Sequence, residues 1–282
     1  MARHNEARLM GYLIREPILQ YTDIEKTNLV RATIQIRTLR GNREFGKDQR
    51  KGYDEQLVMT QQPGIMAFMQ HVHQYDIVDV KGNLITIKTR PIYTCPECGH
   101  TEVCEDTIAV VNPIFIDHVD ATEELKRIDP EKTMTKTEQV ERYLRKRIEI
   151  SNNIAVIGDC IRAPEMFESQ GIVNYALDVT RKYKIREDDI SRRHDYPNIK
   201  CYGAIAKNDY KYIRKGSRVF IDGFIMSRTY YQTVTCPNCG HEWQTIRSRN
   251  EIVPYSVEYL SKCNTGFEEI NNEIEKGTAE GI

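Results

Sequence analysis

The sequence has little tryptophan, almost no net charge and no long apolar run. Its 282 residues contain 1 Trp, and 40 Lys and Arg are balanced by 41 Asp and Glu, which excludes a uniformly basic protein but not local basic stripes. No apolar run approaches the roughly 18–20 residues of a membrane span. The first residues lack an apolar signal core, so we expect a cytoplasmic protein without membrane partners. The 8 cysteines are then expected to be reduced or metal-bound.

Recognisable catalytic motifs are also missing. There is no Gly-rich phosphate loop, no Ser or Cys nucleophile motif and no His-Glu-x-x-His. The Cys-Pro-x-Cys pairs lack the upstream His/Cys-x-Glu of a zinc deaminase. We therefore expect a protein that is not an enzyme. Tyrosine, by contrast, is abundant, with 16 Tyr against 7 Phe, which suits a surface that stacks flat partners and is also common in β-proteins.

The strongest pattern is an internal repeat. Three segments recur in the same order: residues 11–17 as 158–164, residues 78–86 as 219–227, and residues 94–100 as 235–241. The last pair reads Thr-Cys-Pro-Glu-Cys-Gly-His and Thr-Cys-Pro-Asn-Cys-Gly-His, and Pro113 then matches Pro254 in the same register of 141 residues. The chain is thus predicted to contain a duplicated domain.

Each copy is expected to be mostly β-structure. Alternating apolar residues, as in residues 32–37 and 175–180, indicate strands, and Gly82 and Gly223 fall where a coiled strand bends. Five strands with one helix between the third and fourth are the layout of an OB-fold, a Greek-key barrel. We expect a first OB-fold in residues 1–120, a linker in 121–150 with an amphipathic helix after a Thr135–Glu138 capping box, a second OB-fold in 151–265, and an acidic tail or short helix in 266–282.

The second copy resembles bacterial single-stranded DNA-binding proteins. Residues 152–164, Asn-Asn-Ile-Ala-Val-Ile-Gly-Asp-Cys-Ile-Arg-Ala-Pro, resemble the opening of that family. Residues 177–183 resemble its second strand, 212–223 its helix end and fourth strand, and 227–230 the start of the next hairpin. The first copy follows the pattern more weakly. Two departures are the presence of two barrels in one chain and the Cys-Pro-x-Cys-Gly-His insert.

This resemblance implies base-stacking positions. In the second copy they fall on Tyr183, Tyr196, Tyr202 and Tyr230. Aligning the first copy by its strands places Arg40, Tyr53, Met59 and Thr89 there, with Arg90 adjacent, so that copy is the weaker base-stacker. The alternative interpretation is that some of these tyrosines do not stack bases and are ordinary half-buried strand residues.

Two basic segments accompany those positions. Residues 37–51 contain six Lys or Arg against two acids, and residues 181–193 contain six against three. Both follow the second strand of their copy, so we expect Arg40, Arg181 and Lys182 to contact phosphates, unless these are simply solvated hairpins.

The paired Cys-Pro-x-Cys-Gly knuckles predict structural zinc. Tetrahedral zinc needs four ligands, and one ion shared by Cys95, Cys98, Cys236 and Cys239 would join the two copies. Separate sites are the alternative, since the first copy also offers His100 and Cys104. Pairing of knuckles between two chains, or loss of metal, also stays open.

Three functions remain. The first is sequence-tolerant binding of single-stranded DNA in replication, recombination or repair, in a cell, a phage or a mobile element. The others are RNA or tRNA binding on the same barrel, and a zinc-stabilised scaffold of a replication complex. Because the family assembles four barrels, we expect a homodimer, with replication or recombination proteins as further partners.

Overall fold

The computed structural model describes residues 4–40, 52–181 and 194–264. Alternating burial along the strands places every second side chain in a core. In the first half, five strands contribute: β1 (Asn5–Leu13), β3 (Leu29–Leu39), β4 (Tyr53–Thr60), β5 (Ile77–Thr89) and β8 (Asp106–His118). Antiparallel pairs β1–β3, β3–β4, β5–β8 and β1–β5 and the parallel pair β4–β8 close them into a barrel.

The second half repeats this arrangement. Its strands are β9 (Asn152–Cys160), β11 (Ile172–Thr180), β13 (Asn198–Tyr202), β14 (Arg218–Thr235) and β15 (Glu242–Ser261). Pairs β9–β11, β11–β13, β14–β15 and β9–β14 are antiparallel and β13–β15 is parallel. Each barrel has one helix between its third and fourth strands, α1 (Pro63–Met69) and α5 (Gly203–Tyr212). The predicted mostly β fold with a five-stranded barrel is confirmed.

Shorter elements fill the connections. They are β2 (Ile18–Tyr21), β6 (Ile92–Thr94), β7 (Thr101–Val103), β10 (Glu165–Phe167), the 3₁₀ turn η1 (Glu168–Gln170) and β12 (His194–Asp195). Between the barrels lie α2 (Thr122–Ile128), α3 (Lys136–Arg145) and α4 (Ile148–Ser151). None of the helices in the described ranges is both long and apolar enough to cross a membrane.

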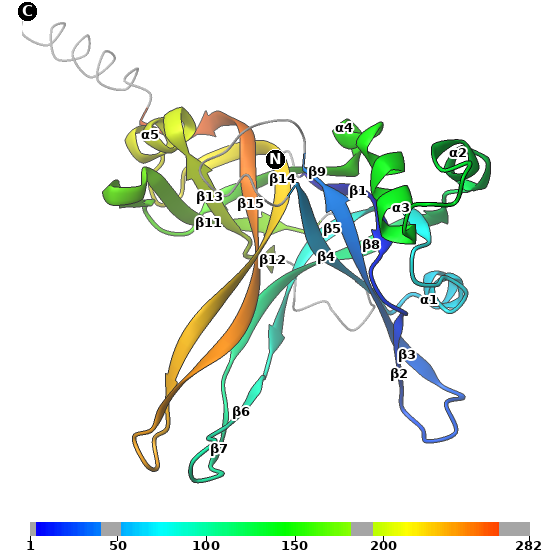
Figure 1. Ribbon diagram of the computed structural model, residues 1–282. Coiled ribbons are helices and arrows are strands. Elements are labelled where there is room, and N and C mark those ends of the chain that lie inside the picture. The colour runs from blue at the N-terminus through cyan, green and yellow to red at the C-terminus, as the bar shows by residue number, and fades with distance from the viewer. Residues whose placement is uncertain (1–3, 41–51, 182–193, 265–282) are drawn as a thin grey trace, which may run out of the picture.

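The linker helices pack on the first barrel (Figure 1). Helix α3 begins at a complete capping box, in which Thr135 and Glu138 satisfy each other's backbone N–H groups. Its apolar face buries Val140 and Leu144 against Tyr12 and other residues of β1, β3 and β5. This helix therefore covers one outer face of the first barrel.

The two barrels share a continuous sheet and a continuous core. Strands β1 and β9 pair antiparallel, with Ala7 opposite Ile154 at the middle of the pairing. These two residues occupy equivalent places in the two copies, so the barrels are related by an approximate two-fold axis through this pair. Buried residues from both barrels form a single apolar cluster beneath the joint.

Two matching ion pairs reinforce the joint. Buried Asp54 accepts hydrogen bonds from Arg40 Nε and Nη2, both at 2.7 Å, and from the backbone N–H of Ser227 in the other barrel at 2.8 Å. Buried Asp195 accepts from Arg181 Nε at 2.6 Å and from the backbone N–H of Thr86 at 2.7 Å. Each carboxylate thus ties an arginine of its own barrel to a strand of the other barrel.

Glycine is required where the long strands bend. A Cβ at Gly82 would lie 2.3 Å from the carbonyl oxygen of Asn112, and a Cβ at Gly223 would lie 2.3 Å from that of Val253. The strand register shifts at both positions. The absent side chain therefore lets β8 and β15 approach closely, as expected for a sharply coiled barrel strand.

The second barrel contains a buried polar cluster around Asp209 of helix α5. Its carboxylate accepts hydrogen bonds from Tyr175 at 2.9 Å, Cys201 at 2.9 Å and Tyr259 at 2.8 Å. Burial raises the pKa of Asp209, although the three donors oppose that change. The cluster attaches α5 to strands β11, β13 and β15.

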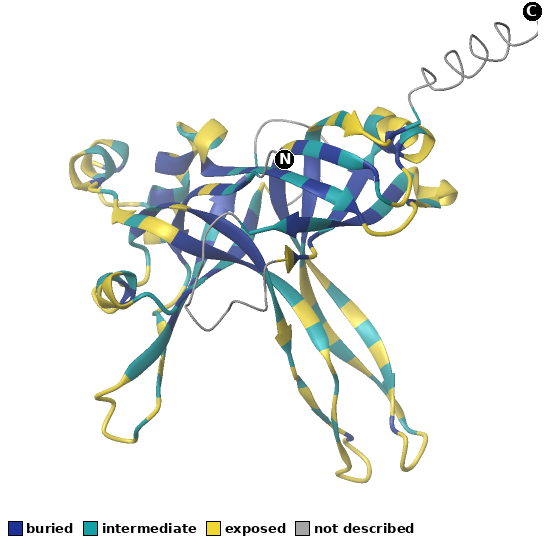
Figure 2. Ribbon diagram, turned by 180° about the vertical axis from the view of Figure 1, so that it is seen from behind, coloured by how far each residue is buried: buried dark blue, intermediate teal, exposed yellow. Residues whose placement is uncertain are grey.

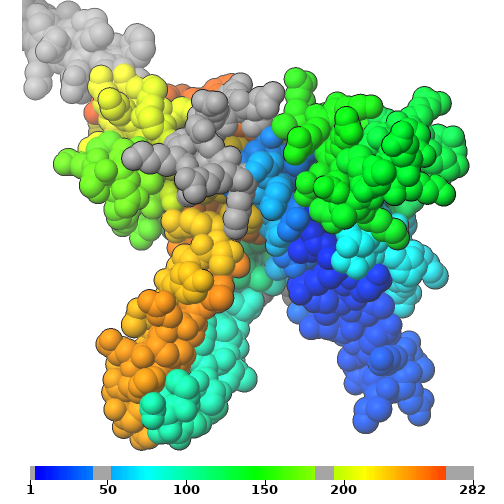
Figure 3. Space-filling view, in the orientation of Figure 1, coloured from blue at the N-terminus to red at the C-terminus, as the bar shows by residue number. Residues whose placement is uncertain are grey.

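Two long hairpins extend away from the barrels and run side by side (Figures 1 and 3). The first arm is residues 85–110, from the end of β5 to the start of β8, and the second arm is residues 226–251 of β14 and β15. Figure 2 shows buried residues concentrated in the barrels and exposed positions alternating along both arms. The arms therefore have little hydrophobic core of their own, so contacts other than core packing must hold them in a defined conformation.

Candidate functional site

The tips of the two arms bring four cysteines together. The Sγ atoms of Cys95, Cys98, Cys236 and Cys239 all lie within 4.8 Å of one another. Cys95 and Cys239 are 3.7 Å apart, and Cys98 and Cys236 are 3.6 Å apart. Within the described part of the chain, neither His100 nor Cys104 belongs to this group. The arrangement is that of the shared site and not of two local sites.

Each pair of cysteines stands on a tight turn. The N–H of Cys95 donates to the carbonyl of His100 at 2.8 Å, and the N–H of Gly99 donates back to Cys95 at 3.0 Å. The second arm repeats both bonds, and Gly240, like Gly99, has a positive φ, of 72°. Glycine tolerates that backbone conformation at no steric cost. The Cys-Pro-x-Cys-Gly sequence therefore presents two thiols on one side of each tip.

The geometry fits tetrahedral zinc. A Zn–S distance of about 2.3 Å gives a tetrahedron with S–S edges of about 3.8 Å, close to the distances between Cys95 and Cys239 and between Cys98 and Cys236. The backbone N–H of His100 and then the Asn238 amide lower the pKa of Cys98 to about 6. These hydrogen bonds favour the thiolate of Cys98, which is the form that binds metal.

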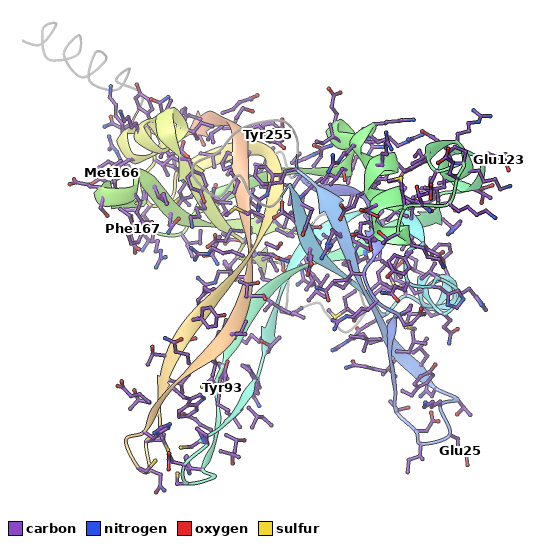
Figure 4. The ribbon with its side chains drawn as sticks, in the orientation of Figure 1. Glu25, Tyr93, Glu123, Met166, Phe167 and Tyr255 are labelled. Atoms are coloured by element: carbon purple, nitrogen blue, oxygen red, sulfur yellow. The ribbon has the colours of Figure 1, made fainter. Side chains whose placement is uncertain are left out.

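Further contacts join the arms below the cysteines. Arg247 Nη1 lies 3.0 Å from Asp106 Oδ2, and the Arg247 guanidinium lies 5.0 Å from the centre of the Tyr93 ring. Figure 4 shows Tyr93 on the side of the first arm that faces the second. Asn250 Nδ2 donates to the carbonyl of Ala109 at 3.2 Å. The arms are thus connected from root to tip.

The second barrel carries tyrosines on one outer face. Tyr196 is 48% exposed, and Tyr202 is partly exposed beside the aromatic cluster of Phe224 and Tyr255. Tyr255 lies on β15 in the upper part of this barrel (Figure 4). Tyr230 is also partly exposed, at the root of the second arm. Tyr183 and Lys182 lie outside the described residues.

Cations stand beside these rings. Lys200 Nζ is 5.8 Å from the Tyr202 ring centre, and the Arg228 guanidinium is 5.5 Å from that of Tyr230. Cation–π contacts at such distances hold the charged group near the ring face. Lys200 is only 6% exposed, whereas Arg228 is exposed, so Arg228 supplies positive charge at the surface beside the Tyr230 ring.

The first barrel differs at the equivalent places, and the strand alignment given above is wrong by two residues in β4. The parallel pairs Val58–Val111 and Ile199–Ile252 fix the equivalence of the two barrels. Tyr196 then matches Glu55, and Tyr202 matches Gln61, instead of Tyr53 and Met59. The first barrel thus has no aromatic ring at these two positions.

The remaining predicted residues lie in different surroundings. Tyr53 lies next to the linker helices, and the Cζ atom of Arg37 is 4.2 Å from the centre of its ring. Met59 is half-buried on β4. Arg40 and Arg181 are largely buried, each in an ion pair with an aspartate of its own barrel at the joint between the barrels. Arg90 is exposed on the first arm, 3.5 Å from Glu105.

Sequence reasoning missed several residues at or beneath the second-barrel face. Arg228, Arg249 and Tyr255 are exposed or partly exposed there, and Lys200, Phe224 and Glu251 are buried beneath it. The available signal was strand alternation, because Lys200 stands two residues before Tyr202 and Arg228 stands two before Tyr230, which places each on the same face as its tyrosine.

Comparison with known proteins gives a consistent result. The model of the single-strand binding protein family matches residues 151–238. Single-stranded DNA-binding protein 1 of Chlorobaculum tepidum is 27% identical over 82 residues, which are 28% of this chain and 51% of the relative. The matched part of this chain thus spans about half the length of that relative.

Solved structures extend the likeness in fold. The wild-type single-stranded DNA binding protein from Thermus aquaticus matches with a TM-score of 0.57 and 14% identity, over 93% of this chain and 95% of that chain. A deletion mutant of the same protein matches with a TM-score of 0.52 and 15% identity, over 93% and 97%. The second barrel of this chain is thus similar in sequence to the single-strand binding protein family, and nearly the whole chain is similar in fold to these solved structures.

Proposed function

We propose that this chain is a non-catalytic protein that binds single-stranded DNA with little sequence preference, in DNA replication, recombination or repair. One observation carries the proposal: the barrel that the family model matches also carries half-exposed tyrosines beside cations. Every base has a π-face, so stacking on tyrosine tolerates any sequence, and each stacked base is worth roughly 1–3 kcal/mol. Cations along the same path bind phosphates.

Fluorescence titration with a dT oligomer at two salt concentrations tests this proposal. We expect tight binding that weakens with salt, because each phosphate contact releases a counterion. Competition with oligo-U and with duplex DNA identifies the preferred strand. Tyr210→Ala is a suitable control, since Tyr210 is exposed on α5, apart from this face. Equal affinity for the duplex would overturn the proposal, and preference for oligo-U would assign the face to RNA.

The four cysteines would hold one structural zinc ion per chain. Bound zinc would supply ordering energy that the arm tips cannot obtain from burial. Cys95 and Cys236 are buried and Cys98 and Cys239 exposed, so the site would be accessible from one side. All eight cysteines are unpaired, which suits a reducing compartment such as the cytoplasm.

We also infer a homodimer. Two chains would supply the four barrels that the family assembles. Light scattering at micromolar concentration tests this inference, and a monomer would leave the two barrels of one chain as the working pair. Replication or recombination proteins would be further partners.

A further inference from the structure

Two arginines face each other across the strands at the root of the second arm. Arg228 of β14 and Arg249 of β15 are directly paired in the antiparallel register. The Arg228 side chain is 42% exposed, and Arg249 is exposed. Like charges directly opposite each other destabilise a strand pair. Some other interaction must therefore account for this arrangement.

The first arm provides an internal control. Its equivalent residues, 141 positions earlier in the repeat, are Ile87 and Ile108, which are likewise paired directly across β5 and β8. Isoleucine suits a half-buried strand position. The hairpin geometry consequently has no need of cations at these two places. The arginine pair belongs to the second arm alone.

The surroundings of the arginine pair also differ between the barrels. Glu251 is only 6% exposed, with Arg228 Nη2 3.9 Å from its Oε1 and Lys200 Nζ 3.8 Å from its Oε2. The Oε2 atom accepts no hydrogen bond at this separation. In the part of the chain that the structure describes, the Arg249 side chain makes no ion pair. Two cations therefore stand beside this one carboxylate, and Arg249 is paired across the strands with one of them, Arg228.

The equivalent cluster in the first barrel is apolar. Lys200 and Glu251 correspond to Met59 and Val110 in the register fixed by the parallel strand pairs. The charged cluster thus belongs to the barrel that also carries Tyr196, Tyr202 and Tyr230. A ligand with flat rings and regularly spaced negative charges fits this combination.

We propose that Arg228 and Arg249 form a phosphate clamp for the backbone of a single-stranded nucleic acid, present on the second barrel and absent from the first. The Arg228 guanidinium lies against the Tyr230 ring, so a phosphate between the two arginines places the neighbouring base close to that ring. The two barrels of one chain then bind the strand unequally, with the second as the main contact. This inference rests on the proposed function.

The double substitution Arg228→Ile and Arg249→Ile tests the clamp. The variant has the same isoleucine pair as the first arm, so the hairpin should still form. Because the contact between two like charges is lost, the melting temperature should be unchanged or higher. On single strands, each phosphate contact contributes about 0.7 to the slope of log K against log salt. Because the variant loses two contacts, we expect this slope for dT binding to become shallower by about 1.4. Arg249→Ile alone should change it by about half as much.

The matched control is Lys126→Ala with Arg127→Ala, which removes two exposed cations from α2 and alters the net charge equally. It should leave the slope unchanged. An unchanged slope in the isoleucine variant, with dT binding intact, would overturn the clamp. An equal loss in the control would show a general charge effect and would also overturn it. Failure of the unaltered protein to bind dT would instead overturn the proposed function.

Discussion

Replacing Cys239 by serine should remove zinc from both arms at once. The four Sγ atoms lie within 4.8 Å of one another, with pairs at 3.7 and 3.6 Å, which leaves room for a single tetrahedral ion. Elemental analysis after gel filtration should therefore give about one zinc per chain, from four thiolates per ion. Cys98→Ser and Cys239→Ser should each abolish stoichiometric zinc, although they stand on different arms.

The effect on order should be local. Loss of the ion should accelerate hydrogen exchange in residues 94–101 and 235–242, which have few buried neighbours. Exchange in β1 and β9 should not change, because these strands are held by the core and by the joint between the barrels. Full-length protein treated with a chelator should behave in the same way as the serine variants.

Cys104→Ser is the control for this experiment, because Cys104 would be a ligand only in a site local to the first arm. It should retain about one zinc per chain. Two zinc ions per chain, or zinc that survives Cys239→Ser but is lost in Cys104→Ser, would refute the shared site. A chain without any zinc would leave the cysteines without a metal role and the nucleic-acid argument unaffected.

Three further predictions concern the barrels. Tyr202→Ala should weaken dT binding by roughly 1–3 kcal/mol in fluorescence titrations, and an unchanged affinity would assign the ring to the core. Gly82→Ala should destabilise the fold by about 1–3 kcal/mol in denaturant unfolding, because its Cβ would meet the Asn112 carbonyl, whereas Gly64→Ala, with open space around it, should not destabilise. Tyr259→Phe should cost about 1–2 kcal/mol through the lost hydrogen bond to the buried carboxylate on α5; a stability equal to that of the unaltered protein would contradict this.

The repeat made the barrel fold accessible from sequence, because glycines and apolar alternation in both copies indicate the same strands. The two-residue error in β4 has a physical cause. Side chains alternate with a period of two, so a shift of two residues keeps every apolar side chain on the same face. The partner of Val58 across the barrel, Val111, and the matching contacts of Asp54 and Asp195 distinguish the two alignments.

The surroundings of individual charges could not be predicted. Arg40 and Arg181 stand in basic segments, and nothing near them in sequence reveals that each pairs with an aspartate 14 residues later. The burial of Asp54 and Asp195 arises from contact between the barrels, which is a long-range property. The cysteine group was more accessible, because two matched knuckles and the four-ligand requirement of zinc favour one shared site.

The contact between Asp106 and Arg247 has a consequence for how the arms choose their partners. The two residues are 141 positions apart, so they are the same position in the two copies and face each other across the approximate two-fold axis. In a dimer of identical chains, that axis would set a residue against itself, as Asp against Asp or Arg against Arg. Fusion of the two copies into one chain lifts this restriction, and the two sides have become opposite in charge. At this position, the Asp106 side chain of a first arm attracts Arg247 of a second arm and repels Asp106 of another first arm. The two arms of one chain therefore pair with each other in preference to the identical arm of another chain.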